Sequence, residues 1–144
     1  MSPSKPEEFR LHRRVQFYET DVAGIVHFSW LFRYMEEAEH ALWREAGLSI
    51  HPPESDIGWP RIAAACDFHR VLRFEDEFDV HLRIVEMNRK TIRYACLVTK
   101  GEEKIATATM TIACVVKKPV MRATEIPAEI VDRLGAVIRI DSRS

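Results

Sequence analysis

The chain has 144 residues, of which 47% are hydrophobic and 30% are charged, a composition that excludes a disordered or fibrous protein. Lys and Arg number 21 against 22 Asp and Glu, and this formal charge of −1 removes the electrostatic basis for binding nucleic acid. No apolar run approaches the roughly 20 residues of a membrane-spanning helix, so no membrane span is expected. We therefore expect a single domain over residues 1–144, with residues 1–8 as a loose terminus.

The N-terminal residues and the cysteines indicate a compartment. Residues 1–14 are polar and charged, without the apolar segment of a secretory signal, which predicts a cytoplasmic protein. Cys66, Cys96 and Cys114 lie far apart in apolar segments and lack the spacing of a zinc site. We expect them to be reduced, buried thiols, with no disulfide and no metal site.

The first predicted elements are a short strand over residues 10–18 and a helix over residues 29–46. The helix is predicted because four apolar residues recur at spacings typical of one helix face, namely Leu31, Met35, Ala38 and Leu42. Ser29 is expected to cap the start of this helix, and Gly47 is expected to follow its end.

After this helix the apolar pattern changes to period two, which indicates strands. Four strands are predicted, over residues 62–68, 80–84, 92–98 and 105–116. Turns fall at residues 88–90 and 100–101, and a short closing helix is predicted over residues 127–136. The order of one strand, one long helix and then several strands predicts an α+β fold, with an antiparallel sheet curled around one central helix.

The residues most indicative of chemistry lie between the first strand and the long helix. Asp21 supplies a carboxylate, Gly24 can adopt positive φ, and the start of the helix follows. The unpaired N–H groups of a helix start suit a developing oxyanion, and a carboxylate beside them supplies a base or a nucleophile. The arrangement suits acyl transfer to water, although Asp before a helix is more often only a cap or turn residue.

The motif Asp21-x-x-Gly24-x-Val26-x-Phe28, followed by a helix rich in aromatic residues, resembles the hotdog-fold thioesterases of the 4-hydroxybenzoyl-CoA thioesterase family. The resemblance continues through residues 65–68 and the Lys-Pro pair at 118–119. It implies a hotdog fold, pairing of protomers into a homodimer or homotetramer, and hydrolysis of acyl-CoA or acyl-carrier thioesters at the dimer interface. It also implies no cofactor beyond the CoA of the substrate.

The resemblance assigns roles to residues of this motif. It implies that Asp21 is the catalytic aspartate and that the backbone N–H of Phe28 polarises the thioester carbonyl. Gly24 and Val26 are expected to contact the substrate. His27 stands one position before the place where one branch of the family has a histidine, so it is a secondary candidate as a proton shuttle.

Other site candidates lie further along the chain. Glu36 matches an acidic family position on the helix and could orient water, whereas Trp30 stands where relatives commonly have Asn or Ser and would reshape the pocket. Asn88, Arg89 and Lys90 resemble a turn that contacts the CoA phosphates in some relatives. Each has a purely structural alternative, as a packed ring, a solvated carboxylate or a solvated turn.

The remaining residues of the helix have structural interpretations. Glu37 and Glu39 are expected to be exposed charges, and Phe32, Tyr34 and Trp43 are expected in the core or at an interface.

Three functions remain open from the sequence. The first is thioester hydrolysis, with Asp21 as base or nucleophile. The second is a hydratase or dehydratase that uses Asp21 and His27 on an enoyl or β-hydroxyacyl thioester. The third is an acyl-binding module without catalysis.

Overall fold

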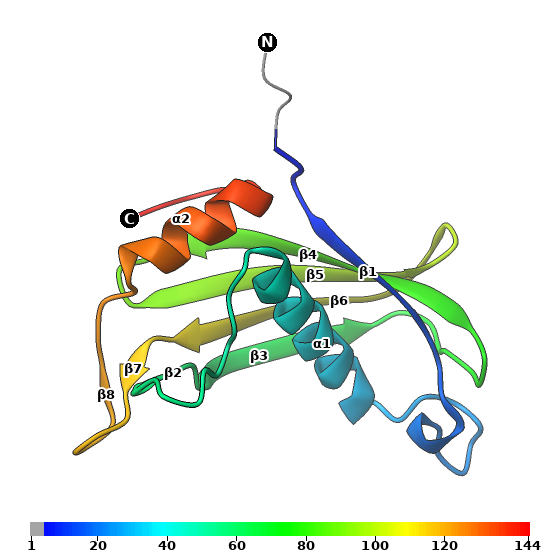
Figure 1. The fold of residues 1–144 in the computed structure, drawn as a ribbon. Helices are drawn as coiled ribbons and strands as arrows, with labels where there is room; N and C mark the ends of the chain where they lie inside the picture. The colour runs from blue at the N-terminus through cyan, green and yellow to red at the C-terminus, as the bar shows by residue number, and fades with distance from the viewer. Residues whose placement is uncertain (1–4) are drawn as a thin grey trace.

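Five strands form the main sheet in the order β1-β4-β5-β6-β3, and all neighbouring strands are antiparallel. The structure, a computed structural model, describes residues 5–144. The sheet curves around helix α1 (Ser29–Glu45), which crosses its concave face (Figure 1). This confirms the predicted α+β class, with one long central helix. The strands are β1 Phe9–Arg14, β3 Arg61–Phe68, β4 Glu77–Met87, β5 Thr91–Lys100 and β6 Glu103–Ala113.

The smaller elements lie at one end of the molecule (Figure 1). Strands β2 (Ile57–Gly58), β7 (Val115–Val116) and β8 (Arg122–Ala123) form a second sheet, and helix α2 (Ala128–Val137) follows. The closing helix was predicted, whereas two-residue strands are too short to leave a periodic pattern in the sequence.

Both N-terminal predictions need correction. The predicted first strand over residues 10–18 ends at Arg14, because the chain then enters a 3₁₀ turn over Phe17–Glu19. Of the predicted loose terminus, residues 1–4 lie outside the described residues. The rest is held by contacts, since the Pro6 carbonyl accepts the Arg139 N–H at 2.9 Å and Glu8 pairs with His81. Within residues 5–144, no helix is long and apolar enough to cross a membrane.

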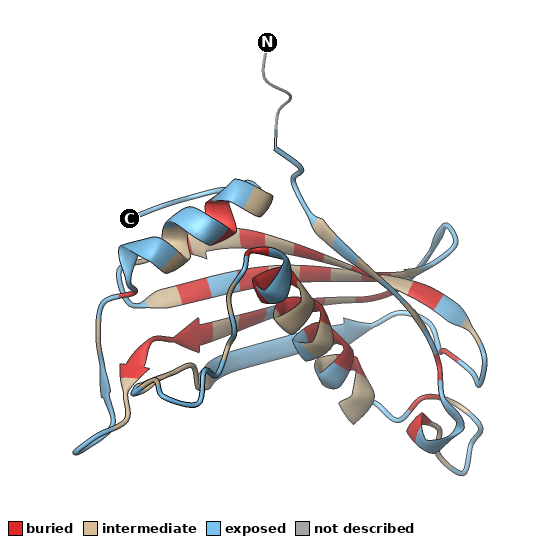
Figure 2. Cartoon of the chain, in the orientation of Figure 1, coloured by how far each residue is buried: buried red, intermediate tan, exposed pale blue. Residues whose placement is uncertain are grey.

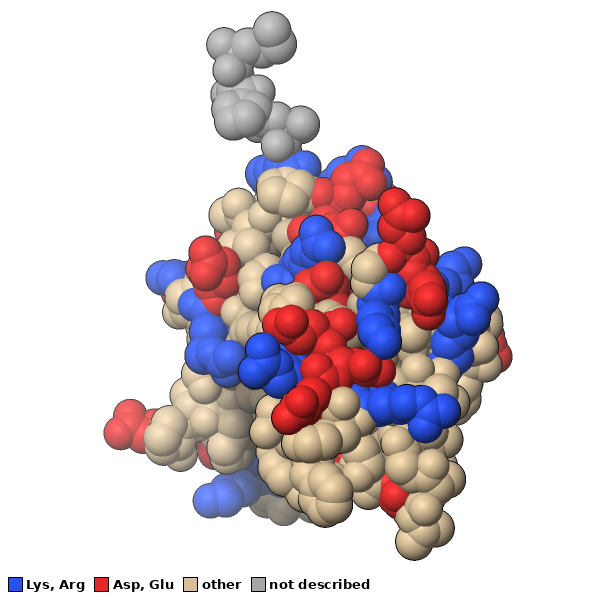
Figure 3. Space-filling view, turned by 90° about the vertical axis from the view of Figure 1, so that its right-hand side faces the viewer, with Lys and Arg blue, Asp and Glu red and all other residues tan. Residues whose placement is uncertain are grey.

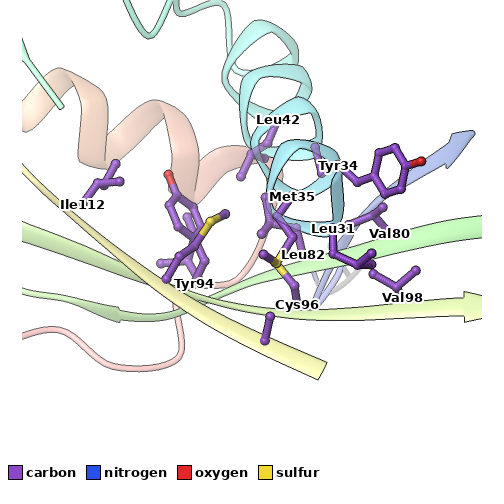
Figure 4. Close-up of a cluster of buried hydrophobic side chains, with 14 of the residues drawn as sticks. Leu31, Tyr34, Met35, Leu42, Val80, Leu82, Tyr94, Cys96, Val98 and Ile112 are labelled. Atoms are coloured by element: carbon purple, nitrogen blue, oxygen red, sulfur yellow. The ribbon is translucent and has the colours of Figure 1, made fainter. Parts of the chain in front are cut away.

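The core fills the space between α1 and the concave face of the sheet (Figure 4), and along the central strands buried residues alternate with residues that are mostly half-buried (Figure 2). The four apolar residues that predicted the helix are all buried. Burying one large apolar side chain contributes roughly 1.5–3 kcal/mol, so this face holds the helix on the sheet. The core side chains labelled in Figure 4 are Leu31, Tyr34, Met35, Leu42, Val80, Leu82, Tyr94, Cys96, Val98 and Ile112.

The two ends of α1 differ in how well they were predicted. Gly47 follows the helix with φ of +75°, as expected of a residue that ends a helix in the left-handed region. The predicted Ser29 cap is wrong. Phe28 is the residue before the first turn, and the Ser29 Oγ lies 2.8 Å from His27 Nδ1.

The prediction that Glu37 and Glu39 are exposed is also wrong. Glu39 is buried and accepts a hydrogen bond from Arg61 at 2.8 Å, and Glu37 is half-buried and accepts one from Arg13 at 2.6 Å. Each partner comes from a strand, so the two ion pairs connect α1 to β1 and to β3.

The cysteines are free thiols, as predicted, although only two of them are buried. Cys66 on β3 is half-buried. Burial raises the pKa of the Cys96 thiol to about 12 and that of Cys114 to about 11, so these two remain protonated and unreactive at neutral pH.

A fully buried carboxylate, that of Glu19, lies at the junction of β1, α1 and the loop before α1. It accepts two N–H groups of the Arg13 guanidinium, the Tyr34 hydroxyl at 2.8 Å and the Gln16 backbone N–H at 2.8 Å. Burial raises the pKa of this carboxyl, but the hydrogen bonds outweigh burial and hold the pKa below its usual range.

The backbone of Glu19 also fixes the loop that precedes α1. Its carbonyl accepts the His27 N–H at 2.9 Å, and Thr20 forms a β-bridge with Val26. The residues between these two contacts, 21–25, therefore form a closed loop with both of its ends tied together.

We predict that Glu19→Gln lowers the free energy of unfolding at neutral pH by about 3 kcal/mol, because it removes one partner of a buried ion pair. The pKa of Glu19 in the folded protein lies below the usual 4.5. The ionised carboxylate therefore contributes its full stabilisation above pH 4.5, and this stabilisation is lost as the pH falls through the lowered pKa. Chemical denaturation across this pH range measures the difference between variant and wild type. Glu37→Gln is the control and is expected to cost less, because Glu37 is partly solvated. A Glu19→Gln effect that stays constant into the acid range would contradict the assignment.

Candidate active site

The Asp21 loop is a tight turn that its own backbone closes. The Asp21 N–H donates to the Ile25 carbonyl at 2.9 Å, and the Gly24 N–H donates to the Asp21 carbonyl at 2.9 Å. Gly24 has φ of +78°, and a Cβ there would meet no atom within 4 Å. Glycine is therefore needed for the backbone conformation and not for space.

A cavity of about 230 Å³ opens beside this loop. The loop, the start of α1, the end of β3 and the start of β6 all contribute to its wall. Most of the wall is apolar, and its charged members are Asp21 and Arg70. Its volume is below the ~300–1,000 Å³ of sites for whole drug-sized ligands, so it suits one part of a larger molecule. The lining residues are Asp21, Ile25, Val26, Phe28, Leu31, Phe68, Arg70, Val71, Leu72 and Ile105.

The Asp21 carboxylate is held in one orientation and keeps one oxygen free. Its Oδ1 accepts the Ala23 backbone N–H at 2.8 Å, while Oδ2 makes no hydrogen bond to any residue in the range 5–144. The side chain is half-buried at the cavity wall. Oδ2 can therefore accept a proton from a bound water or attack a bound electrophile.

Phe28 lies on the same wall, and its backbone N–H is a free donor. The neighbouring N–H groups are used, since Trp30 donates to the His27 carbonyl at 2.9 Å and Leu31 to the Phe28 carbonyl at 3.2 Å. Ser29 donates to His27 Nδ1 at 3.3 Å. In the part of the chain that the structure describes, the Phe28 N–H has no acceptor. It lies at the positive end of a 17-residue helix, which favours a negatively charged oxygen.

Four of the residues singled out in the motif are brought together, and one is turned away. Asp21, Val26 and Phe28 line the cavity, and Gly24 shapes the turn beside it. His27 is exposed and does not line the cavity. Its ring packs on that of Phe28, with the centroids 4.5 Å apart, and its Nδ1 caps the start of α1.

Trp30 and Glu36 do not line the cavity either. The Trp30 ring lies between those of Tyr18 and Tyr34, at centroid distances of 5.7 and 6.0 Å. Glu36 is exposed on α1, and its Oε2 lies 3.4 Å from the Nη2 of Arg61. Both residues have structural contacts that account for their positions.

The turn Asn88–Lys90 lies at the opposite end of the sheet from the Asp21 loop (Figure 1). The side-chain amide of Asn88 donates to Glu86 Oε1 at 2.7 Å, and the Arg89 Nε donates to Glu125 Oε1 at 3.0 Å. Within one chain this turn is therefore not brought to the cavity.

Several lining residues were missed as site residues because strand pairing, and not sequence spacing, brings them to the wall. Phe68 at the end of β3 pairs with Ala106 of β6. The next two residues turn back, and the Arg70 N–H donates to the Ile105 carbonyl at 3.1 Å. The pairing of β3 with β6, together with the hydrogen bond from the Val26 N–H to the Leu72 carbonyl at 2.8 Å, brings in the missed residues: Arg70, Val71, Leu72 and Ile105.

The surface around the cavity mouth is apolar. Phe28, Phe68 and Val71 of the cavity wall are exposed, and so is Val22 in the Asp21 loop. Figure 3 views the molecule from this end, and its lower part shows a region with few Lys, Arg, Asp or Glu side chains. Among residues 5–144 no group of three or more His, Cys, Asp or Glu is placed to hold a metal ion.

Comparison with known proteins gives a family. The model of the thioesterase-like superfamily matches residues 15–134. A hypothetical protein of Aquifex aeolicus, of known structure, is 34% identical with a TM-score of 0.82, and the match covers 88% of this chain and 98% of that one. The 1,4-dihydroxy-2-naphthoyl-CoA hydrolase of Synechococcus elongatus is 25% identical over 130 residues, which are 88% of this chain and 95% of that protein. A gentisyl-coenzyme A thioesterase structure is 28% identical with a TM-score of 0.77, over 85% of this chain and 98% of its own.

The matched region contains the Asp21 loop, α1, the main sheet from β3 onward and the whole cavity wall. The hotdog architecture and the thioesterase family that the motif predicted are therefore confirmed, and the chain belongs to the thioesterase-like superfamily.

Proposed function

We propose that this protein hydrolyses an acyl-CoA thioester in the cavity beside Asp21, releasing the free acid and CoA. The observation that carries the proposal is that two residues of one apolar wall each have an unused polar group, the Oδ2 of Asp21 and the N–H of Phe28. Thioester hydrolysis needs a base or nucleophile and an oxyanion donor, and these two groups are of those kinds.

We further propose that the acyl group is aromatic. Two relatives act on the CoA thioesters of aromatic acids, according to their names. Phe28 and Phe68 on the wall offer ring surfaces for an aromatic group, and the small volume suits an acyl group with CoA lying outside.

In this reaction the thioester carbonyl oxygen would accept the Phe28 N–H, which stabilises the negative charge that develops there. Asp21 Oδ2 would take a proton from water as the water oxygen attacks the carbonyl carbon, or would itself attack and form an anhydride that water then cleaves. The carbon–sulfur bond breaks in both routes, and CoA leaves as the thiolate and gains a proton. The reaction requires no cofactor beyond the CoA of the substrate.

We predict that Asp21→Asn folds normally and loses about 10²-fold or more in kcat, because the amide is neither a base nor a competent nucleophile. Release of free thiol from a panel of aromatic and aliphatic acyl-CoAs is the measurement. Asp132→Asn, on the exposed side of α2, is the matched control and is expected to keep full activity. Turnover of Asp21→Asn close to that of the control would overturn the assignment.

The same panel separates the other functions. A hydratase would change enoyl absorbance without releasing thiol, and a binding module would do neither.

A second prediction tests the backbone donor. Phe28→Leu keeps the N–H and is expected to keep most of kcat, whereas Phe28→Pro deletes it and is expected to lose about 10²–10³-fold. Circular dichroism and thermal melting must show that the Pro variant is folded, because Pro restricts the residue before it. Equal kcat values for two folded variants would exclude the Phe28 N–H as the oxyanion donor.

We also propose that the protein is at least a dimer that pairs through β3. The two edges of the sheet differ, since β1 carries the exposed charges Arg10, His12 and Arg14, which protect an edge from pairing. The β3 edge instead exposes Ile62, with 60% of its surface accessible, and residues 63–65, which are all alanine (Figure 2). An apolar edge with unpaired backbone groups favours a second copy of the same strand.

We therefore predict that light scattering gives at least twice the mass of one chain. Ile62→Lys is expected to shift the protein toward monomer, because it puts a charge on the apolar edge. Val120→Lys changes another exposed apolar residue, which lies away from β3, and serves as the control. A fully active monomeric wild type would refute the pairing.

A further inference from the structure

The cavity wall contains a second charged side chain, which neither the motif nor the proposed reaction uses. Arg70 follows β3, and its backbone is fixed by the hydrogen bond to the Ile105 carbonyl at 3.1 Å. Arg70 is one of the residues that line the cavity, and its exposed side chain makes no ion pair or hydrogen bond with any residue of the described chain, 5–144. The Asp21 carboxylate on the same wall does not pair with it.

A ligand that fills this cavity therefore lies beside a residue with a permanent positive charge. The guanidinium carries five N–H donors and does not lose its proton at physiological pH. An apolar group that covered the guanidinium would displace the water bound to these donors and supply no hydrogen-bond acceptor in its place, which is unfavourable. A carboxylate matches the planar donor geometry with two parallel hydrogen bonds. The other lining residues of the described chain are apolar apart from Asp21, so a carboxylate in the cavity would find its cationic partner in Arg70.

We propose that Arg70 is a specificity-determining residue that binds a carboxylate on the acyl group, so that the preferred substrate is the CoA thioester of an aromatic dicarboxylic acid. This inference rests on the proposed function, in that it names the substrate class of the same cavity. Asp21 and the Phe28 N–H act at the thioester, and Arg70 holds the far end of the acyl group.

The test compares binding of benzoyl-CoA with that of 3- and 4-carboxybenzoyl-CoA by titration calorimetry, in the Asp21→Asn protein so that the thioesters persist. We expect at least one carboxylated thioester to bind about tenfold more tightly than benzoyl-CoA. This gain in affinity is near the lower limit for hydrogen bonds between charged groups, because Arg70 is exposed to solvent. Adding Arg70→Met is expected to abolish this preference. Adding Arg73→Met, which removes the same charge three residues away and outside the lining, is expected to leave it unchanged.

Two results would overturn the proposal. The first is an absence of preference for either carboxylated thioester. The second is that Arg70→Met weakens the binding of all three CoA thioesters equally but does not weaken the binding of the corresponding pantetheine thioesters. Arg70 would then bind the phosphates of CoA and not the acyl group. Wild-type hydrolysis of benzoyl-CoA without preference would leave the hydrolase standing and remove only the role of Arg70. Failure to release thiol from any acyl-CoA would remove the hydrolase, while the calorimetric comparison would still decide what Arg70 binds.

Discussion

The ion pair between Arg13 and the buried Glu19 carboxylate determines where the candidate active site stands in the fold. Arg13 belongs to β1, and the second ligand of the carboxylate, Tyr34, belongs to α1, so one side chain connects the sheet, the helix and the loop between them. A buried ion pair is often no more stabilising than an apolar replacement. Its contribution here is geometric, since the Glu19 backbone in turn holds His27 just before the Phe28 donor.

Two acidic residues two positions apart have different surroundings, and these suit them to different roles. Glu19 accepts four hydrogen bonds in the core, and they hold its charge in place. Asp21 accepts one backbone N–H at the wall of a cavity and keeps an oxygen unused. The Glu19 carboxylate would have to give up contacts of its own to accept a proton, whereas Asp21 Oδ2 makes no hydrogen bond within residues 5–144. Of the two carboxylates, that of Asp21 is therefore the one suited to the proposed reaction.

The sequence predicted features that repeat and missed features that depend on distant partners. The helix and the central strands were predicted because their apolar residues recur with a regular period over many positions. Glu39 was expected in solvent, because nothing near it in the chain indicates Arg61, which reaches it from β3. The motif around Asp21 predicted three residues that line one cavity, namely Asp21, Val26 and Phe28. The far wall, including Arg70, depends on the pairing of β3 with β6 and so could not be located before the sheet was known.

The proposal that a main-chain group is the oxyanion donor has an evolutionary consequence. Every residue except proline supplies an N–H at position 28, so replacing the side chain there alters the shape of the cavity and leaves the donor intact. The proposed chemistry and the proposed selectivity are therefore encoded by separable parts of one residue. A protein of this kind could acquire specificity for new acyl groups by single substitutions at position 28, without passing through an inactive intermediate.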